Sequence, residues 1–158
     1  MKGIAVFALV FLVLASASCE VMNVTYSSHA GLDGFKQRNP CQVAIIVATW
    51  CPDCVNSKAT QEQLRQTALK AGWSVLNGDV GTSAQFRDPK NYLVADPLYQ
   101  VHAIPSLYMI VNNVITYSVV DQQVYDQNMV KTLISKVSQG MPQGCQAPTP
   151  ALKKLALQ

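Results

Sequence analysis

The hydrophobic and polar positions along the chain follow two different spacings. Residues 43–48 (VAIIVA) form a short, continuous and mostly β-branched run, which is typical of a strand buried on both faces of a sheet. Over residues 52–71 the apolar positions recur at helical spacing, and Gly72 then offers a common helix stop. The pattern predicts a buried strand that runs directly into a helix.

The same two spacings predict the remaining elements. Expected strands are 21–26, 43–48, 73–76, 104–111 and 114–120, and expected helices are 29–38, 52–71, an interrupted one within 92–101, and 124–138. Residues 77–90 have several turn-forming clusters and no steady period, which predicts a long loop. Asn112-Asn113 can form a two-residue hairpin turn, since Asn tolerates the left-handed conformation. Strands that alternate with helices and end in a hairpin predict an α/β fold, a three-layer α/β/α sandwich with a mixed central sheet.

The first residues of the chain carry a separate apolar pattern. Lys2 precedes an unbroken apolar run at residues 4–14, and small residues follow up to Cys19. This layout predicts a secretory signal peptide over residues 1–19, cut after Ala17 or after Cys19. The apolar run would span about half of a bilayer core, so we expect no membrane span after cleavage. The expected location is secreted, periplasmic or in the lumen of the secretory pathway.

The length of 158 residues allows one domain with a sizeable core. We assign that domain to residues 20–139 and a tail rich in Pro, Gly and Gln to residues 140–158. The formal net charge of +3 falls to about +2 once Lys2 is removed, and no basic block remains. We therefore expect no binding to nucleic acid or to an anionic membrane. We also expect the protein to be a monomer. Asn23 begins the sequon Asn-Val-Thr, which is either a glycosylation site or a chance match.

The parity of the cysteines depends on where the signal peptide is cut. The chain has five cysteines, Cys19, Cys41, Cys51, Cys54 and Cys145. A cut after Cys19 leaves four, which allows a 51–54 pair and a structural 41–145 pair in an oxidising compartment, whereas a cut after Ala17 leaves an odd thiol. Cys41 is either bonded to Cys145 or a thiol at a strand start. Lipidation of Cys19, as in a bacterial lipoprotein, is disfavoured because Ser16 stands where a Leu-like residue is usual.

The stretch TWCPDCVNSK carries the candidate chemistry. Pro52 suits the first position of a helix, so Cys51 lies at the helix N-terminus, where unpaired N–H groups and the helix dipole stabilise a thiolate. Cys54 lies one helical turn further on, within reach of a disulfide. The spacing predicts that Cys51 attacks a substrate disulfide and that Cys54 resolves the mixed disulfide. The redox-active disulfide would serve without any further cofactor.

Asp53 lies between the two cysteines and predicts the direction of the reaction. A carboxylate beside a thiolate raises the pKa of the thiol by like-charge repulsion. Strong oxidants depend on a very stable thiolate, so Asp53 favours reduction or isomerisation of disulfides. A zinc site is disfavoured, because the chain has no second CxxC and His29 and His102 are 73 residues apart. A purely structural 51–54 bridge would close too small a loop to stabilise the protein much.

The motif and the order of the elements together resemble a known family. The order strand, WCxxC, helix, strand, loop, Ile104-Pro105, hairpin, helix resembles the thioredoxin fold, and WCPDC resembles the branch that carries this motif in place of WCGPC. The similarity covers about residues 21–138. It implies that Ile104-Pro105 is a cis-proline dipeptide facing the dithiol, that the backbone of Ile104 pairs with the substrate, and that Trp50 flanks the site.

The chain departs from the thioredoxin pattern at several positions. Ile45 stands where thioredoxins have a buried Asp that serves in proton transfer, Asp121 replaces a usual glycine after the hairpin, and 77–90 is longer than in the plain pattern. Two functional classes remain open. One is a thiol-disulfide oxidoreductase that acts on protein or peptide disulfides with an unidentified electron donor. The other is a binding module that holds cysteine-containing peptides with little turnover.

Overall fold

The computed structural model describes residues 19–145. The predicted signal peptide, apart from Cys19, and the part of the predicted tail beyond Cys145 lie outside these residues, so both stay predictions. Within the described part of the chain, none of the helices combines the length and the apolar character needed to cross a membrane.

A mixed five-stranded sheet forms the centre of the domain, in the order β1-β3-β2-β4-β5. The strands are β1 (Val21–Thr25), β2 (Gln42–Val47), β3 (Ser74–Asp79), β4 (Ser106–Val111) and β5 (Val114–Val120). Strands β1 and β2 both pair with β3 in parallel, whereas β4 pairs with β2 and with β5 in antiparallel fashion. The predicted mixed sheet is confirmed, with β1 and β5 at its two edges.

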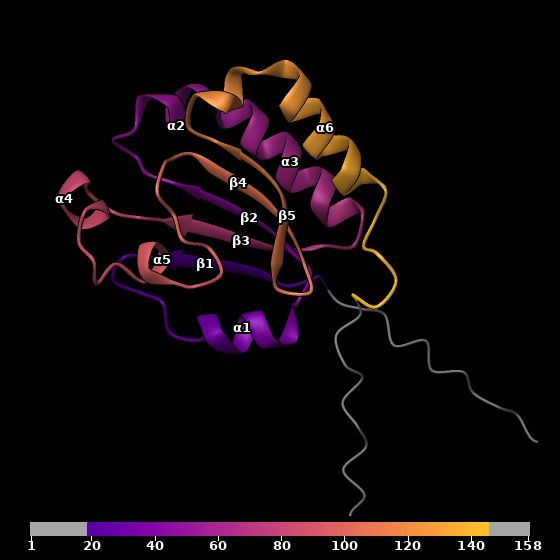
Figure 1. Ribbon diagram of the computed structural model, residues 1–158, viewed down its shortest axis with the longest axis horizontal. Coiled ribbons are helices and arrows are strands. Elements are labelled where there is room, and N and C mark those ends of the chain that lie inside the picture. The colour runs from indigo at the N-terminus through magenta and orange to yellow at the C-terminus, as the bar shows by residue number, and fades with distance from the viewer. Residues whose placement is uncertain (1–18, 146–158) are drawn as a thin grey trace, which may run out of the picture.

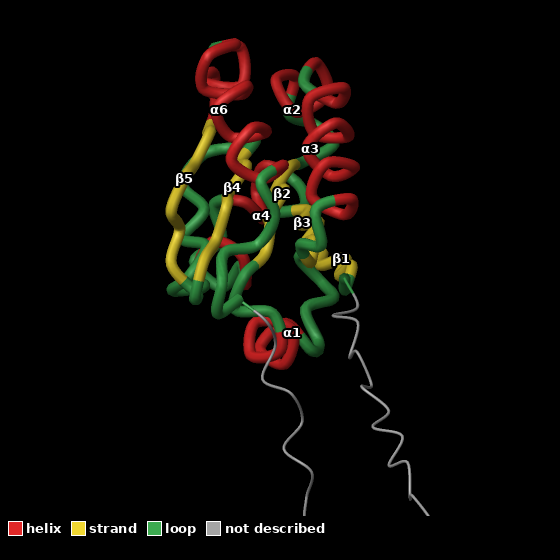
Figure 2. Tube along the Cα trace, turned by 90° about the vertical axis from the view of Figure 1, so that its right-hand side faces the viewer, coloured by secondary structure: helices red, strands yellow, loops and turns green. Residues whose placement is uncertain are grey.

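Helices cover both faces of this sheet (Figures 1 and 2). One face carries α3 (Lys58–Lys70) and α6 (Gln127–Ser138), and the other carries α1 (Leu32–Arg38). Four short helices lie in the connections: α2 (Pro52–Asn56), α4 (Ser83–Phe86), α5 (Tyr92–Ala95) and the 3-10 helix η1 (Asp121–Tyr125). The expected three-layer α/β/α sandwich is therefore confirmed.

The central strand β2 explains the unbroken apolar run of the sequence. Its side chains alternate between two cores, with Val43 and Ile45 packed under α3 and α6, and Ala44 and Ile46 packed on the side of α1. All four are at most 2% exposed. Because neither face of β2 meets water, no polar residue interrupts the run.

The single helix expected over 52–71 is wrong, because it is divided at Ser57 into α2 and α3. The Ser57 hydroxyl donates to the Asp53 carbonyl oxygen at 2.6 Å, and the Gln61 side-chain amide donates to the Cys54 carbonyl oxygen at 2.7 Å. The Asp53 carbonyl also accepts the Ser57 backbone N–H at 3.0 Å, so the hydroxyl adds a second bond to it, and the Gln61 side chain satisfies the Cys54 carbonyl at the break. The spacing of apolar residues is insensitive to such a break.

The loop expected over 77–90 is also partly wrong. Strand β3 continues to Asp79 and is paired on both sides, although its last residues are polar or glycine. A Cβ atom on Gly78 would lie 2.8 Å from a methyl carbon of Leu93, so the glycine is needed for close packing. Further on, Thr82 and Gln85 form a capping box that begins α4.

The remaining boundaries differ by a few residues. The helix expected within 92–101 ends at Ala95, and the last helix begins at Gln127 because Asp126 caps it after η1. The hairpin turn is confirmed, since Asn112 and Asn113 have φ angles of 53° and 58°.

Candidate active site

The two cysteines of the motif lie where β2 passes into α2. Cys51 is the N-cap of α2 and Pro52 stands at the start of the helix. The backbone N–H of Cys54 donates to the Cys51 sulfur at 3.1 Å. The two cysteines are disulfide-bonded, with their Cα atoms 5.2 Å apart, and are 5% and 3% exposed. This arrangement places the Cys51 sulfur at the end of the helix that favours a negative charge.

The segment that precedes β4 faces this dithiol. The peptide bond between Ile104 and Pro105 is cis, and the Ile104 carbonyl oxygen lies 3.7 Å from the Cys51 sulfur. The structure thus brings the Ile104-Pro105 dipeptide to Cys51, which lies 53 positions before Ile104 in the sequence.

Trp50 forms one wall of the site and is 42% exposed. Its indole N–H donates to the Gly81 carbonyl oxygen at 2.5 Å, and its ring lies 6.3 Å from that of Phe86, measured between centroids. The segment before α4 therefore supports the tryptophan, and the longer connection lies beside the site.

That connection is held together by its own polar groups. Asn91 is fully buried and its side-chain amide donates to the carbonyl oxygens of Val80 and Gln85, both at 3.0 Å. The Asp79 carboxylate accepts the backbone N–H of Gly81 at 2.8 Å. Asp79 thus acts as a turn residue, and Gly81 is fixed where its carbonyl group meets Trp50.

Tyr125 contacts the motif from another element and is a residue that the sequence did not single out. Its hydroxyl donates to the Oδ1 atom of Asp53 at 2.7 Å, and 48% of the residue is exposed. The hydrogen bond to the carboxylate raises the pKa of Tyr125. The two residues are 72 positions apart, so no local pattern could reveal the contact.

Two departures from the thioredoxin pattern have clear structural settings. Ile45 is 2% exposed in the core beneath α3 and α6, so the position of the usual acid is apolar here. Asp121 has a φ angle of 52°, in the left-handed region that glycine adopts freely, and its backbone N–H donates to the Pro105 carbonyl oxygen at 2.8 Å. The aspartate thus supports the cis-proline segment through its backbone.

Cys41 and Cys145 form a second disulfide, with their Cα atoms 5.4 Å apart. Cys41 immediately precedes β2 and Cys51 follows it, so the two bridges lie at opposite ends of the same strand (Figure 1). Both residues of this bridge are buried, and the Asn112 N–H donates to the Cys41 sulfur at 3.3 Å. Asn23, the sequon residue, is exposed on edge strand β1, where its side-chain oxygen accepts a bond from Asn77 at 3.0 Å.

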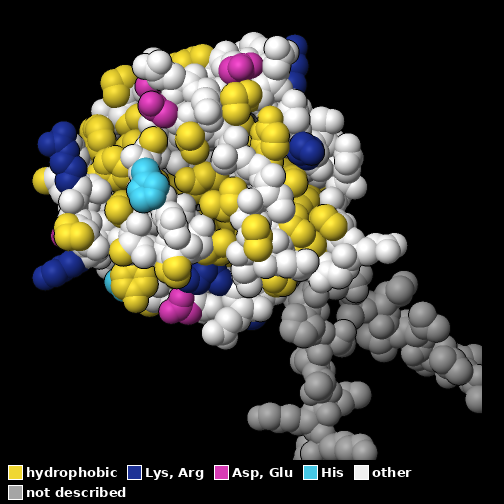
Figure 3. All heavy atoms as spheres, viewed as in Figure 1, with side chains coloured by type: hydrophobic (Ala, Val, Ile, Leu, Met, Phe, Trp, Pro, Cys, Tyr) yellow, Lys and Arg dark blue, Asp and Glu magenta, His cyan; other side chains and the backbone are white. Residues whose placement is uncertain are grey.

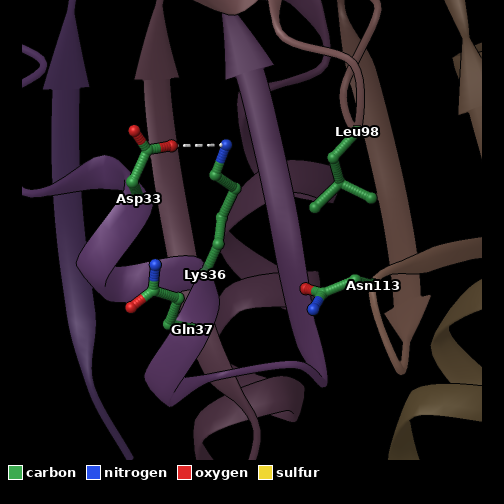
Figure 4. Close-up of a pocket in the computed structure, with 5 residues that line it drawn as sticks. All are labelled: Asp33, Lys36, Gln37, Leu98 and Asn113. Atoms are coloured by element: carbon green, nitrogen blue, oxygen red, sulfur yellow. Dashed lines mark ion pairs between the residues drawn. The ribbon is translucent and has the colours of Figure 1, made fainter.

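A separate hollow lies beside α1, away from the dithiol (Figure 4). It is lined by Asp33, Lys36, Gln37, Leu98 and Asn113. The Lys36 ammonium lies 2.9 Å from Asp33 and 2.5 Å from the buried Asp96. Burial lowers the pKa of Lys36, but its bonds to the two carboxylates outweigh this and raise it. Since Asp96 also accepts the backbone N–H of Leu98, this cluster ties α1 to the turn that follows α5.

Two features of the remaining surface concern its charged side chains and its possible metal ligands. On the face seen in Figure 3, hydrophobic side chains lie across the middle and Lys and Arg are scattered around the rim. Among residues 19–145, His, Cys, Asp and Glu side chains nowhere gather in threes as metal ligands.

A known family matches the part of the chain that forms this site. Residues 47–136 match the family model described as the thioredoxin domain of thioredoxin domain-containing protein 17-like proteins. The chain belongs to this family. The matched residues run from the end of β2 into α6 and include the dithiol, the α4 connection and the cis-proline. No curated protein sequence matches the chain at a significant level.

Among solved structures similar to this chain are several thioredoxins, and the one from Plasmodium falciparum shares the fold. The oxidised thioredoxin of Plasmodium falciparum is 16% identical over 77% of this chain and 99% of its own, with a TM-score of 0.51. A thioredoxin mutant from Halobacterium salinarum is 22% identical over 78% of this chain and 95% of its own, with a TM-score of 0.49. Thioredoxin from Trypanosoma brucei brucei is 16% identical over 75% and 94%, also with a TM-score of 0.49. At this identity the likeness concerns the fold.

Proposed function

We propose that the protein is an extracytoplasmic thiol-disulfide oxidoreductase that reduces or isomerises disulfides in proteins or peptides. The observation that carries this proposal is the position of Cys51. It caps the N-terminus of α2, is bonded to Cys54, and lies 3.7 Å from the carbonyl oxygen of Ile104, beside the cis-proline. Family membership supports redox chemistry at such a pair, and the predicted signal peptide supports the location.

The proposed reaction begins with the reduced dithiol. The Cys51 thiolate attacks one sulfur of the substrate disulfide, the substrate S–S bond breaks, and the other substrate sulfur leaves as a thiolate that takes a proton. The Cys54 thiolate then attacks the Cys51 sulfur, which forms the Cys51–Cys54 disulfide and releases the second substrate thiolate. Two electrons pass to the substrate, and an external thiol or dithiol restores the reduced pair.

The site residues have distinct parts in this proposal. The backbone of Ile104, before the cis-proline, would pair with the substrate chain, and Trp50 would contact its side chains. Asp53 would make Cys51 less acidic than in a strong oxidant, which favours reduction or isomerisation over disulfide donation. The dithiol would need neither a metal nor an organic cofactor, and the protein would act as a monomer.

Insulin-disulfide reduction with dithiothreitol tests the proposal. We expect the wild type to accelerate the reaction and Cys51→Ser to lose the acceleration, because the attacking sulfur is gone. The matched control is the double variant Cys41→Ser/Cys145→Ser, which removes the other disulfide and should keep the acceleration below its own melting temperature. Equal rates of insulin reduction for the wild type and Cys51→Ser would refute the proposed enzymatic function.

A peptide-binding module is the second candidate, because the dithiol is flanked by the half-exposed aromatic side chains of Trp50 and Tyr125. Cys54→Ser distinguishes the two functions. In an oxidoreductase this variant should accumulate covalent mixed disulfides on Cys51, since the resolving thiol is missing. A binder would instead retain peptides without a covalent bond, and dithiothreitol would not release them.

A further inference from the structure

We propose that Tyr125 is a positioning residue that holds the Asp53 carboxylate and thereby limits its repulsion of the Cys51 thiolate. This inference rests on the proposed function, in which Cys51 is the attacking sulfur. It assigns a part in the reaction to η1, whose Tyr125 lies 72 positions after Asp53 in the sequence.

The contact is built from an anchored element. The 3-10 helix η1 is fixed to the cis-proline segment by the bond from the Asp121 N–H to the Pro105 carbonyl, at 2.8 Å. Its Val124 side chain is 3% exposed in the core under α3 and α6. Tyr125 follows directly and reaches Asp53 at 2.7 Å. The phenol is therefore presented to Asp53 by a rigid support, although its ring is half exposed.

The position of Asp53 makes its carboxylate important for the thiolate. It lies in the first turn of α2, between the cysteines, and competes with the Cys51 sulfur for the positive end of the helix. A phenol that donates to a carboxylate draws part of the negative charge onto the hydrogen bond and fixes its place. Without Tyr125 the carboxylate would lose this donor, and it would be free to turn toward the sulfur.

Charged groups on the neighbours of α2 must be kept constant in any test. The elements that pack most closely against α2 are α3 and η1. Their charged side chains are Lys58, Glu62, Arg65 and Lys70 on α3 and Asp121 on η1, and Asp126 follows η1. A substitution confined to the phenolic oxygen leaves all of these in place.

The test is a double-mutant cycle read by the pH dependence of Cys51 alkylation, in a Cys54→Ser background. Iodoacetamide is the probe, and peptide mass spectrometry resolves Cys51 from the other cysteines. Tyr125→Phe should raise the pKa of Cys51 by about half a unit, which is roughly a threefold loss of thiolate near neutral pH. Asp53→Asn should lower the pKa of Cys51, and adding Tyr125→Phe to it should then change nothing.

Tyr26→Phe is the matched control. Tyr26 donates to the Asp88 carboxylate at 2.9 Å, a bond of the same kind between other elements, so its loss should leave the pKa of Cys51 unchanged. An unchanged Cys51 pKa in Tyr125→Phe, or an equal shift in the Asp53→Asn background, would overturn the inference. The cycle needs no turnover, so a wild type inactive toward insulin would refute the proposed function and leave this result readable.

Discussion

Gly81 shows how much of the site depends on single residues outside the motif. Its carbonyl oxygen accepts the indole N–H of Trp50, and its φ angle of 77° lies in the left-handed region. A Cβ atom at this position would collide with the side-chain oxygen of Gln85, and would lie 3.1 Å from the Cβ of Tyr26. The backbone that supports Trp50 therefore requires glycine for two separate reasons.

Gly81→Ala should destabilise the protein more than Gly72→Ala does. Gly72 has a φ angle of 87° and nothing within 4 Å of an added Cβ, so its substitution reports the left-handed strain alone, about 1–2 kcal/mol. Gly81→Ala adds the displacement of Gln85 and loss of the α4 capping box, about 1 kcal/mol more. Urea denaturation measures both variants. Equal losses of unfolding free energy would contradict the collision.

The sequence revealed only part of the site at this scale. Cys51 and Cys54 could be predicted from their motif, and Pro105 could be predicted from the resemblance to the thioredoxin fold. The contacts of Trp50 with Gly81 and of Asp53 with Tyr125 could not, because each joins residues that are brought together by the packed sheet. No spacing rule applies to pairs 31 and 72 positions apart.

At the scale of elements, Glu20 fastens the start of β1 to the end of α1. Its carboxylate accepts bonds from the Arg38 guanidinium at 2.6 Å and from the Asn39 side-chain amide at 2.8 Å. The bond from Arg38 lowers the pKa of Glu20, and partial burial opposes this only in part. The ionised carboxylate is therefore favoured in the folded protein over the unfolded chain.

Arg38→Met should make the stability of the protein less sensitive to acid. Because the pKa of Glu20 is lowered by folding, its contribution is present above the unfolded value of 4.5 and disappears as the pH falls through the lower folded value. Because the pair is exposed to solvent, the loss of stability is small. Urea midpoints at pH 7 and pH 3 measure it.

The matched control is Lys131→Met, which removes an exposed cation of α6 that forms no ion pair within residues 19–145. The wild type should exceed Arg38→Met in stability at pH 7, and this difference should vanish at pH 3. A difference that persists in acid would show that Arg38 acts through packing alone. Lys131→Met should show no such pH-dependent difference.

The elements themselves were largely predictable, and their exceptions have local causes. Buried strands and the amphipathic helix α6 can be predicted from apolar periodicity, and the sequence assigned each of them correctly as strand or helix. The break at Ser57 and the polar end of β3 were missed because side-chain hydrogen bonds and strand pairing on both sides decide them. Such factors leave no mark on the spacing of hydrophobic residues.

At the scale of the whole molecule, the Cys41–Cys145 bridge spans most of the domain. The two residues are 104 positions apart, so the bond restricts most of the domain in the unfolded state. In the chain-entropy model a closed loop of about 100 residues contributes about 4.7 kcal/mol of stability. This value is a large fraction of the stability of a domain of this size.

The double variant Cys41→Ser/Cys145→Ser should therefore lose about 3–5 kcal/mol of unfolding free energy. Urea denaturation at equilibrium, without reductant, measures the loss. In protein that retains residue 19, Cys19→Ser is the matched control, because Cys19 is an exposed free thiol, and it should leave the midpoint unchanged. A double variant as stable as the wild type would assign the bridge no structural importance.

The position of this bridge also offers a site for immobilising the protein. Strand β2 lies between Cys41 and Cys51, and its six residues alone extend over about 20 Å. A bead or a sensor surface coupled next to Cys145 would therefore hold the protein by the pole opposite the dithiol. The reactive face would point into solution, accessible even to a folded protein as bulky as the domain itself.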